Sequence, residues 1–214
     1  GRLTGYERLY VEGSRAWLGE PAEMIRAWST MSALYPEQPT GHHNLGNVYW
    51  WYQNDFARAL QAYERAVAAG GGLRFVSLSH RGYCLLGLGR PQEALRSFED
   101  GWKLSKILLQ AGLADGYMVL GRYAEARAFL DRSESQANPL YELEARFRGV
   151  ELDVVLGRLR EASTAAETAR AFAVSSGLMR WEKHARAAAL AVLERAPDRG
   201  RFLQALRRTV ARDL

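Results

Sequence analysis

The feature that most constrains the fold of this chain is a seven-residue segment that recurs five times. Its copies are LGEPAEM, QNDFARA, LGRPQEA, LGRYAEA and LGRLREA, and each has Gly or Asn close to its start. These marker residues lie 35, 35, 32 and 36 positions apart, and they are Gly19, Asn54, Gly89, Gly121 and Gly157. A period in this range indicates stacked supersecondary units, because a single globular core would impose no such repeat.

Each copy has the chemistry of a turn between two helices. Gly and Asn tolerate the left-handed backbone conformation that often closes the C-terminus of a helix. Pro21 and Pro91 follow two residues after their markers. Proline is favoured at the first position of a helix, where its missing N–H would have no partner within the helix in any case. The segment therefore predicts the corner of an antiparallel helix pair.

The length of the chain allows about five such pairs and further helices near the C-terminus. Apolar residues at i, i+3, i+4 and i+7 predict helices on both sides of each corner. We expect one all-α domain over residues 1–214, a right-handed superhelical solenoid of antiparallel helix pairs. The predicted units are 4–36, 39–70, 74–106, 107–137 and 140–176, followed by terminal capping helices over 178–213.

The second unit, Gly41 to Gly70, resembles the tetratricopeptide repeat. The residues at the small and large packing positions of that repeat are Leu45, Gly46, Tyr49, Ala59, Tyr63 and Ala66. His42 stands where the repeat usually has Trp, and one extra residue lies between Tyr49 and Asp55. The extra residue predicts a first helix that is one residue longer or bulged. The resemblance covers nearly the whole chain, and it implies a helical solenoid that binds other proteins.

A narrower resemblance concerns the N-terminal part of the chain. The phrases ERLY, ALYPEQP and NLGNVY are similar to repeat segments found C-terminal to kinase, nucleotide-cyclase or winged-helix domains in bacterial regulators. The chain also begins with Gly1 and Arg2 instead of Met, so we expect it to be part of a longer protein. This resemblance implies a regulatory or scaffold role.

In the tetratricopeptide fold, the first helix of each pair lines a concave groove, which implies candidate binding residues here. The candidates are Tyr6, Trp17, His43, Asn44, Asn47, Trp50, Trp51, Tyr83, Phe147 and Arg148. This lining is aromatic and apolar with scattered polar groups, which is typical of a surface that captures a peptide or a helix. We therefore expect a protein or peptide partner.

Trp50 and Trp51 are the strongest candidates, because large rigid aromatic side chains dominate binding interfaces at about 2 kcal/mol or more each. Adjacent residues on a helix point about 100° apart. At least one of the two could therefore pack between units and make no contact with a partner, and both interpretations stay open at this point.

The asparagines Asn44 and Asn47 match positions with which some relatives clamp a terminal carboxylate. The Lys residues of that clamp are replaced here by His43, Ser79 and Ala111. This departure weighs against recognition of a terminal carboxylate. Asparagine at these positions can also hydrogen-bond within the repeat.

The sequence contains no catalytic or metal-binding constellation, so we predict a non-enzymatic module without a cofactor. His42 and His43 have no His or carboxylate at i+3 or i+4, and we expect them to be surface or groove histidines. The glycines from Gly70 to Gly72 follow no strand, and they predict a flexible turn between repeats. Cys84, the single cysteine, lies in the apolar context YCLLGLG and is expected to be buried.

The charge pattern leaves several partners to weigh. The net charge is +5, and Arg is concentrated in the last twenty residues, where a solvated helix face is expected. Nucleic-acid binding through this end is a minor alternative, as is a homodimer through a solenoid end that includes Trp181. No apolar run approaches the roughly 18 residues of a membrane span, so we expect no membrane insertion. Cytoplasm is favoured over periplasm, and a sensor of a small ligand or signalling peptide is the main alternative function.

Overall fold

A computed structural model of the chain describes residues 4–17, 19–105, 110–131 and 138–178. Within these ranges the secondary structure consists of ten α-helices and one short 3₁₀ helix, with no strand. The predicted all-α fold class is confirmed. The predicted terminal helices over 178–213, with Trp181 and the Arg-rich end, lie almost entirely outside the described residues.

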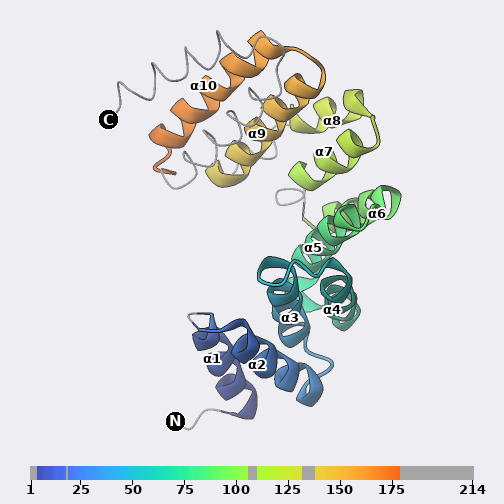
Figure 1. Cartoon of the computed structure of the whole chain (residues 1–214), viewed down its shortest axis with the longest axis vertical. Helices are drawn as coiled ribbons and strands as arrows, with labels where there is room; N and C mark the ends of the chain where they lie inside the picture. Colours follow the sequence, from blue (N-terminus) through green and yellow to red (C-terminus); the bar gives the residue numbers. More distant parts are fainter. Residues whose placement is uncertain (1–3, 18, 106–109, 132–137, 179–214) are drawn as a thin grey trace. The chain divides into compact units, whose positions relative to one another are not determined.

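The helices fall into two compact units, with a boundary after Leu120. Unit 1 contains α1 (Gly5–Ala16), α2 (Pro21–Leu34), α3 (Pro39–Trp51), α4 (Phe56–Ala69), η1 (Gly71–Leu73), α5 (Arg74–Gly87), α6 (Pro91–Leu104) and α7 (Gln110–Val119) (Figure 1). Unit 2 contains α8 (Tyr123–Leu130), α9 (Pro139–Val155) and α10 (Leu159–Ser175). The prediction of a single domain over 1–214 stays a prediction.

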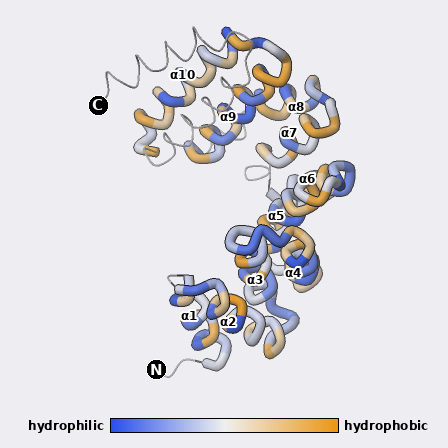
Figure 2. The backbone as a smooth tube through the Cα atoms, viewed as in Figure 1, coloured by the Kyte–Doolittle hydropathy of each residue, from blue (hydrophilic) through white to orange (hydrophobic). Residues whose placement is uncertain are grey.

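In unit 1, each helix contacts the next one along the chain. The connections between α1 and α2, α3 and α4, and α5 and α6 are three or four residues long, and connections this short join antiparallel neighbours. Figure 2 shows hydrophobic and hydrophilic residues interspersed along the helices, as expected for helices that bury one face. None of the helices described here is long and apolar enough to cross a membrane.

The predicted chemistry of the corners is confirmed at four markers. Asn54, Gly89, Gly121 and Gly157 have positive φ angles of 52°, 70°, 70° and 72°. These residues close the preceding helices in the left-handed conformation, which Gly and Asn adopt most readily. At the remaining corner, the first along the chain, Gly19 donates its N–H to the carbonyl of Ala16 at 2.9 Å.

The extra residue of the second unit lies in the turn after α3. After α5, the N–H of Arg90 bonds to the carbonyl of Leu85, five residues back, at 2.9 Å. After α3, the equivalent bond runs from Asp55 to Tyr49, six residues back, at 2.8 Å. Helix α3 has 13 residues and α5 has 14. The prediction of a longer or bulged first helix is therefore wrong, because the turn accommodates the insertion.

The core of unit 1 repeats one contact, in which a glycine of the first helix receives an aromatic ring of the second. The pairs are Gly13 with Trp28, Gly46 with Tyr63, and Gly82 with Phe98. A Cβ atom at these glycines would lie 2.5, 2.7 and 2.3 Å from the ring, closer than carbon atoms can approach. The three rings are 0% exposed. The pattern of small and large residues therefore sets how closely the paired helices approach.

Three further observations concern Cys84, the glycines before α5 and the packing of α9 on α10. Cys84 is buried, as expected. Gly71 and Gly72 form the start of the short helix η1, so the glycine segment is a structured turn. In unit 2, Leu143 of α9 packs against Ala169 and Ala173 of α10.

Candidate partner-binding surface

Trp50 packs inside unit 1. Its ring stacks on Tyr83 of α5 with 5.9 Å between centroids and an interplanar angle of 23°. It also meets the ring of His80 edge-on at 5.3 Å and that of Tyr63 at 6.4 Å. Trp50 is half-buried in these contacts, so it joins α3 to α4 and α5. Of the two interpretations left open for the tryptophan pair, packing between helices is therefore the one that describes Trp50.

Trp51 lies on the surface and is 56% exposed. Its ring is 6.0 Å from that of Trp17, at the end of α1, and Trp17 is 5.7 Å from Tyr52. Tyr52 directly follows α3 and is 47% exposed. These three rings, Trp17, Trp51 and Tyr52, form what we call the aromatic platform. Sequence reasoning missed Tyr52, although the run YWWY from Tyr49 could have indicated it.

The aromatic platform rests on a second layer of rings. Trp51 contacts Trp50 at 6.1 Å and His80 at 5.9 Å between centroids. His80 in turn contacts Tyr63 at 5.3 Å. The second layer is packed between α3, α4 and α5, so Trp51, the platform residue that contacts it, has a packed base.

The expectation that His42 and His43 are surface or groove histidines is wrong. They are 6% and 7% exposed. The His42 Nε2 atom lies 3.0 Å from the carbonyl oxygen of Pro36, and His43 Nδ1 lies 2.9 Å from Ser77 Oγ. The ring of His43 also stacks on that of His80 at 5.2 Å. The burial of His42 and His43 could not be predicted from their adjacent positions in the sequence, because burial depends on how α3 is rotated against its neighbouring helices.

Burial also changes the acid–base behaviour of the stacked pair. It lowers the pKa of His43 to about 4, and burial together with the nearby His43 lowers the pKa of His80 to about 3. Both rings are therefore neutral at pH 7, since removal from water disfavours the charged form. The pair is part of the support beneath the platform.

Asn47 makes its contact within the repeat. It is 5% exposed and accepts a hydrogen bond of 2.6 Å from the hydroxyl of Tyr63. Burial raises the pKa of Tyr63, so its hydroxyl keeps the proton that it donates. Asn44 is half-buried. Asn47 therefore hydrogen-bonds within the repeat, which is one of the roles considered for these asparagines.

Hydrogen bonds link residues that stand one repeat apart in neighbouring first helices. The Tyr6 hydroxyl donates to Thr40 Oγ1 at 2.8 Å, 34 residues along the chain. His43 and Ser77 have the same separation. The Tyr83 hydroxyl donates to Asp115 Oδ2 at 3.2 Å, over 32 residues. Tyr6 and Tyr83 are half-buried, so these candidates also hold the first helices together.

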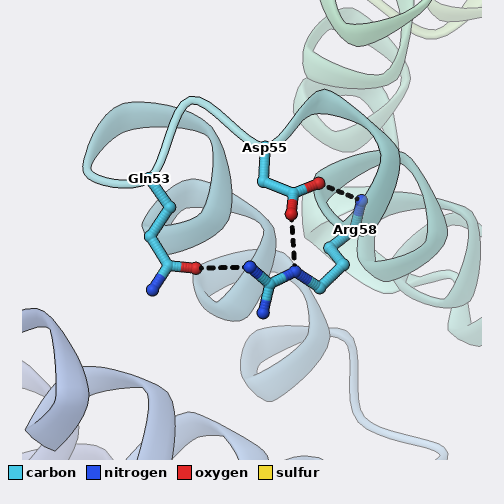
Figure 3. Close-up of polar contacts among 3 residues, drawn as sticks. All are labelled: Gln53, Asp55 and Arg58. Carbon is cyan, nitrogen blue, oxygen red and sulfur yellow. Dashed lines mark hydrogen bonds and ion pairs between the residues drawn. The ribbon is translucent and has the colours of Figure 1, made fainter.

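The turn beside the aromatic platform is fastened by Arg58, as Figure 3 shows. The Arg58 Nε atom donates to Asp55 Oδ2 at 2.6 Å, and Nη2 donates to Gln53 Oε1 at 3.1 Å. Asp55 also caps α4, because its Oδ1 accepts from the backbone N–H of Arg58 at 2.9 Å. The guanidinium lies 4.7 Å from the centre of the Tyr49 ring. All of these contacts hold the Tyr52 end of α3 in place.

The two candidates in unit 2 have different surroundings. Phe147 packs partly buried against the core of α9 and α10. Arg148 Nη1 lies 3.4 Å from the Glu151 carboxylate. Their contact with a partner stays a prediction.

An open cleft of about 740 Å³ lies among α8, α9 and α10. Arg127 pairs with Asp153 across it, and Arg146 pairs with Glu142 at 2.5 Å. Small residues, Ala145 and Gly149, line it together with these ion pairs. These four charged side chains pair with one another, and Asp131, Arg160 and Glu161 also line the cleft.

Two observations concern metal binding and thiol reactivity in the parts of the chain that the structure describes. No group of three or more His, Cys, Asp or Glu residues there could hold a metal ion. Burial raises the pKa of Cys84 to about 12, so the thiol stays protonated and unreactive at neutral pH. The predicted absence of enzymatic activity stays a prediction.

Comparison with known proteins gives one family match. Residues 40–69 match the model of the tetratricopeptide repeat. This range contains α4 and all of α3 except Pro39, and α3 carries Trp50 and Trp51. No curated protein matches the sequence.

Several solved structures share the fold. The apo form of RapI has a TM-score of 0.72 at 13% identity, over 98% of this chain and 84% of that one. TTC0263, a thermophilic tetratricopeptide protein of Thermus thermophilus, has a TM-score of 0.62 at 20% identity, over 87% and 100%. YrrB, described as having an unusual peptide-binding site, has a TM-score of 0.56 at 16% identity, over 75% and 82%.

These identities are low, and the likenesses establish the fold. A tetratricopeptide fold supports a role as a scaffold for protein–protein interaction. Residues 40–69 therefore contain a tetratricopeptide repeat, and the chain shares the helix-pair fold of solved tetratricopeptide-repeat proteins.

Proposed function

We propose that unit 1 binds a segment of a partner protein, and that the aromatic platform of Trp17, Trp51 and Tyr52 is the anchor. The observation that carries this proposal is the exposure of Trp51 and Tyr52, at 56% and 47%, on a packed base. Exposed aromatic side chains on a rigid support are typical of binding hot spots, which contribute about 2 kcal/mol or more each.

The other candidates of unit 1 take supporting roles in this proposal. His43, Asn47 and Trp50 hold the platform from beneath through the contacts described above. Tyr6 and Tyr83 tie the first helices together. Asn44, half-buried on α3, is the remaining polar group that could bind the backbone of a partner segment.

The proposed biological setting rests on the resemblance of the N-terminal part of the chain to repeat segments of bacterial regulators. We propose that the chain is the regulatory part of a bacterial multidomain protein, and that partner binding controls an attached or separate effector. YrrB, which shares the fold, is described as having a peptide-binding site, and this supports a peptide or extended segment as partner. The sensor, nucleic-acid and homodimer alternatives stay predictions.

The test is a selection of peptides from a random display library on the whole chain. We expect selected peptides to bind a Trp17→Ala/Trp51→Ala variant at least about 30-fold more weakly, the equivalent of about 2 kcal/mol. The matched control is Leu34→Ala, which removes another exposed apolar side chain, 63% exposed, on α2. Circular dichroism checks that all three proteins have equal helicity.

Two results would contradict the proposal. Peptides that bind the double variant and the wild type equally would place the binding surface elsewhere. A selection that yields no specific peptide would argue against binding of a linear segment altogether.

A further inference from the structure

In the part of the chain that the structure describes, arginine covers some aromatic rings but none of the three rings of the aromatic platform. Arg58 lies over Tyr49 at 4.7 Å, and Arg146 lies over Phe172 at 4.6 Å from the ring centre. Among the residues with described positions, no cation lies over the rings of Trp17, Trp51 or Tyr52. The faces of these rings carry negative electrostatic potential, which attracts cations.

The nearest part of the chain cannot easily supply that cation. Arg58 belongs to the turn that follows Tyr52, but its guanidinium is held by Asp55, Gln53 and the ring of Tyr49 (Figure 3). Arg15 is in the last turn of α1 and is exposed. It lies two residues before Trp17, and side chains two positions apart on a helix point about 200° apart.

The backbone at this place adds to the negative potential. Trp17 is the C-cap of α1, Trp51 is the last residue of α3, and Tyr52 is its C-cap. A helix C-terminus carries the equivalent of about half a negative charge, which favours a nearby cation. Helix α3 contains no Asp, Glu, Lys or Arg, so no charge on this helix offsets the effect. The C-terminus of α3 therefore lies beside Trp51 and Tyr52, and the Trp17 ring from the end of α1 contacts both of them.

The shape of the platform selects among cations. The Trp17 ring is tilted by 48° to Trp51 and by 46° to Tyr52, and Trp51 and Tyr52 are 56% and 47% exposed. A closed box of rings would suit a compact quaternary ammonium group. An open face suits the flat guanidinium of arginine, which stacks on aromatic rings and is more weakly hydrated than the ammonium group of lysine.

We propose that the aromatic platform recognises an arginine side chain in the partner's segment. This inference rests on the proposed function, since it specifies the chemistry of the partner at the same surface. The guanidinium lies flat on the face of Trp51, beside Trp17 and near the C-terminal ends of α1 and α3. The rest of the partner segment follows the first helices of unit 1.

The experiment is a double-mutant cycle on the whole chain with the peptides selected on the platform. Each Arg of a peptide is replaced by citrulline, which has nearly the same shape but no charge. We expect one such replacement to weaken binding to the wild type by about 2- to 30-fold. The same replacement should have no effect on binding to a Trp51→Leu variant, which keeps an apolar side chain but has no aromatic face.

Control measurements make the outcomes distinct. Tyr10→Ala changes another exposed aromatic residue of α1, 48% exposed, and it should keep the full effect of citrulline. Replacement of the peptide Arg by Lys should give a partial loss, because an ammonium group cannot stack flat. Circular dichroism shows whether Trp51→Leu remains folded. If Trp51→Leu is unfolded, the cycle is run with Trp17→Leu, which removes the ring beside Trp51.

Platform-dependent peptides that lack Arg, or that tolerate citrulline, would overturn this inference and leave the proposed function intact. Full tolerance of Lys would overturn the preference for a flat guanidinium. If no selected peptide depends on the platform, the proposed function fails and the inference fails with it.

Discussion

Replacement of Gly82 by alanine tests the packing rule that sets the spacing of the helices in unit 1. A Cβ atom at Gly82 would lie 2.3 Å from the ring of Phe98. Phe98 is 0% exposed and meets Tyr83 edge-on at 5.1 Å. On another side it faces Gly112 of α7, where a Cβ atom would lie 2.7 Å from the ring. The ring is therefore enclosed and cannot swing aside, so α5 and α6 must separate.

Two opposing terms decide the magnitude of the effect. Extra volume in a packed core costs about 1–3 kcal/mol. Alanine is favoured over glycine within a helix by about 1 kcal/mol. The 2.3 Å approach at Gly82 is shorter than those at Gly13 and Gly46, so we expect a packing cost in the upper part of that range, about 2–3 kcal/mol. Gly82→Ala should therefore lower the free energy of unfolding by about 1–2 kcal/mol, or the Tm by about 5–10 °C for a unit of this size.

Thermal and urea denaturation followed by circular dichroism measures this difference. The matched control is Gly149→Ala in α9, where the added Cβ meets only Arg127 Nη1 at an ordinary distance of 3.5 Å. That variant should be as stable as the wild type, or more stable by up to about 1 kcal/mol. Equal stability of Gly82→Ala and the wild type, or equal destabilisation of both variants, would refute the reasoning.

Three further predictions concern unit 1. Burial lowers the pKa of His43 to about 4, so only the unfolded chain gains this proton as the pH falls from 6.5. Stability should therefore decrease between pH 6.5 and 4 by on the order of 3 kcal/mol, and urea titrations of the wild type and His43→Gln should show less loss in the variant. Tyr63→Phe removes the donor to buried Asn47 and should cost about 1–3 kcal/mol in the same assay, unlike Tyr10→Phe. A Cβ atom at Gly89 would meet no other atom within 4 Å, but the φ angle of this residue is 70°. Gly89→Ala should therefore lower the free energy of unfolding by about 1–2 kcal/mol, because alanine is strained in the left-handed conformation. Unchanged stability would contradict this reasoning.

The corners of the fold could be predicted from the sequence because their chemistry is local. A left-handed residue at the end of a helix restricts the choice to Gly or Asn, and this choice recurs at Asn54, Gly89 and Gly157. The small and large residues of the repeat follow the same logic over a longer range, as in the contact of Gly46 with Tyr63. Both signals keep their meaning without knowledge of the tertiary structure.

The candidate site was less accessible to sequence reasoning, because exposure depends on how each helix is rotated against its neighbours. His43 and Trp50 stand on the first helix of a pair, yet both pack against His80 of the next first helix. Trp51, one position further, faces water. Tyr52 lies beyond the end of α3, and its closeness to Trp17 follows from the packing of two repeats, which no spacing rule contains.

Photocrosslinking in the cells that produce the protein would test partner binding at the aromatic platform in its natural setting. The photoreactive residue p-benzoylphenylalanine replaces Tyr52 in one protein and Leu34, which is also exposed, in the other. We predict a discrete crosslinked partner from position 52 and none from position 34. No adduct at position 52, or the same adducts from both positions, would contradict binding at the platform.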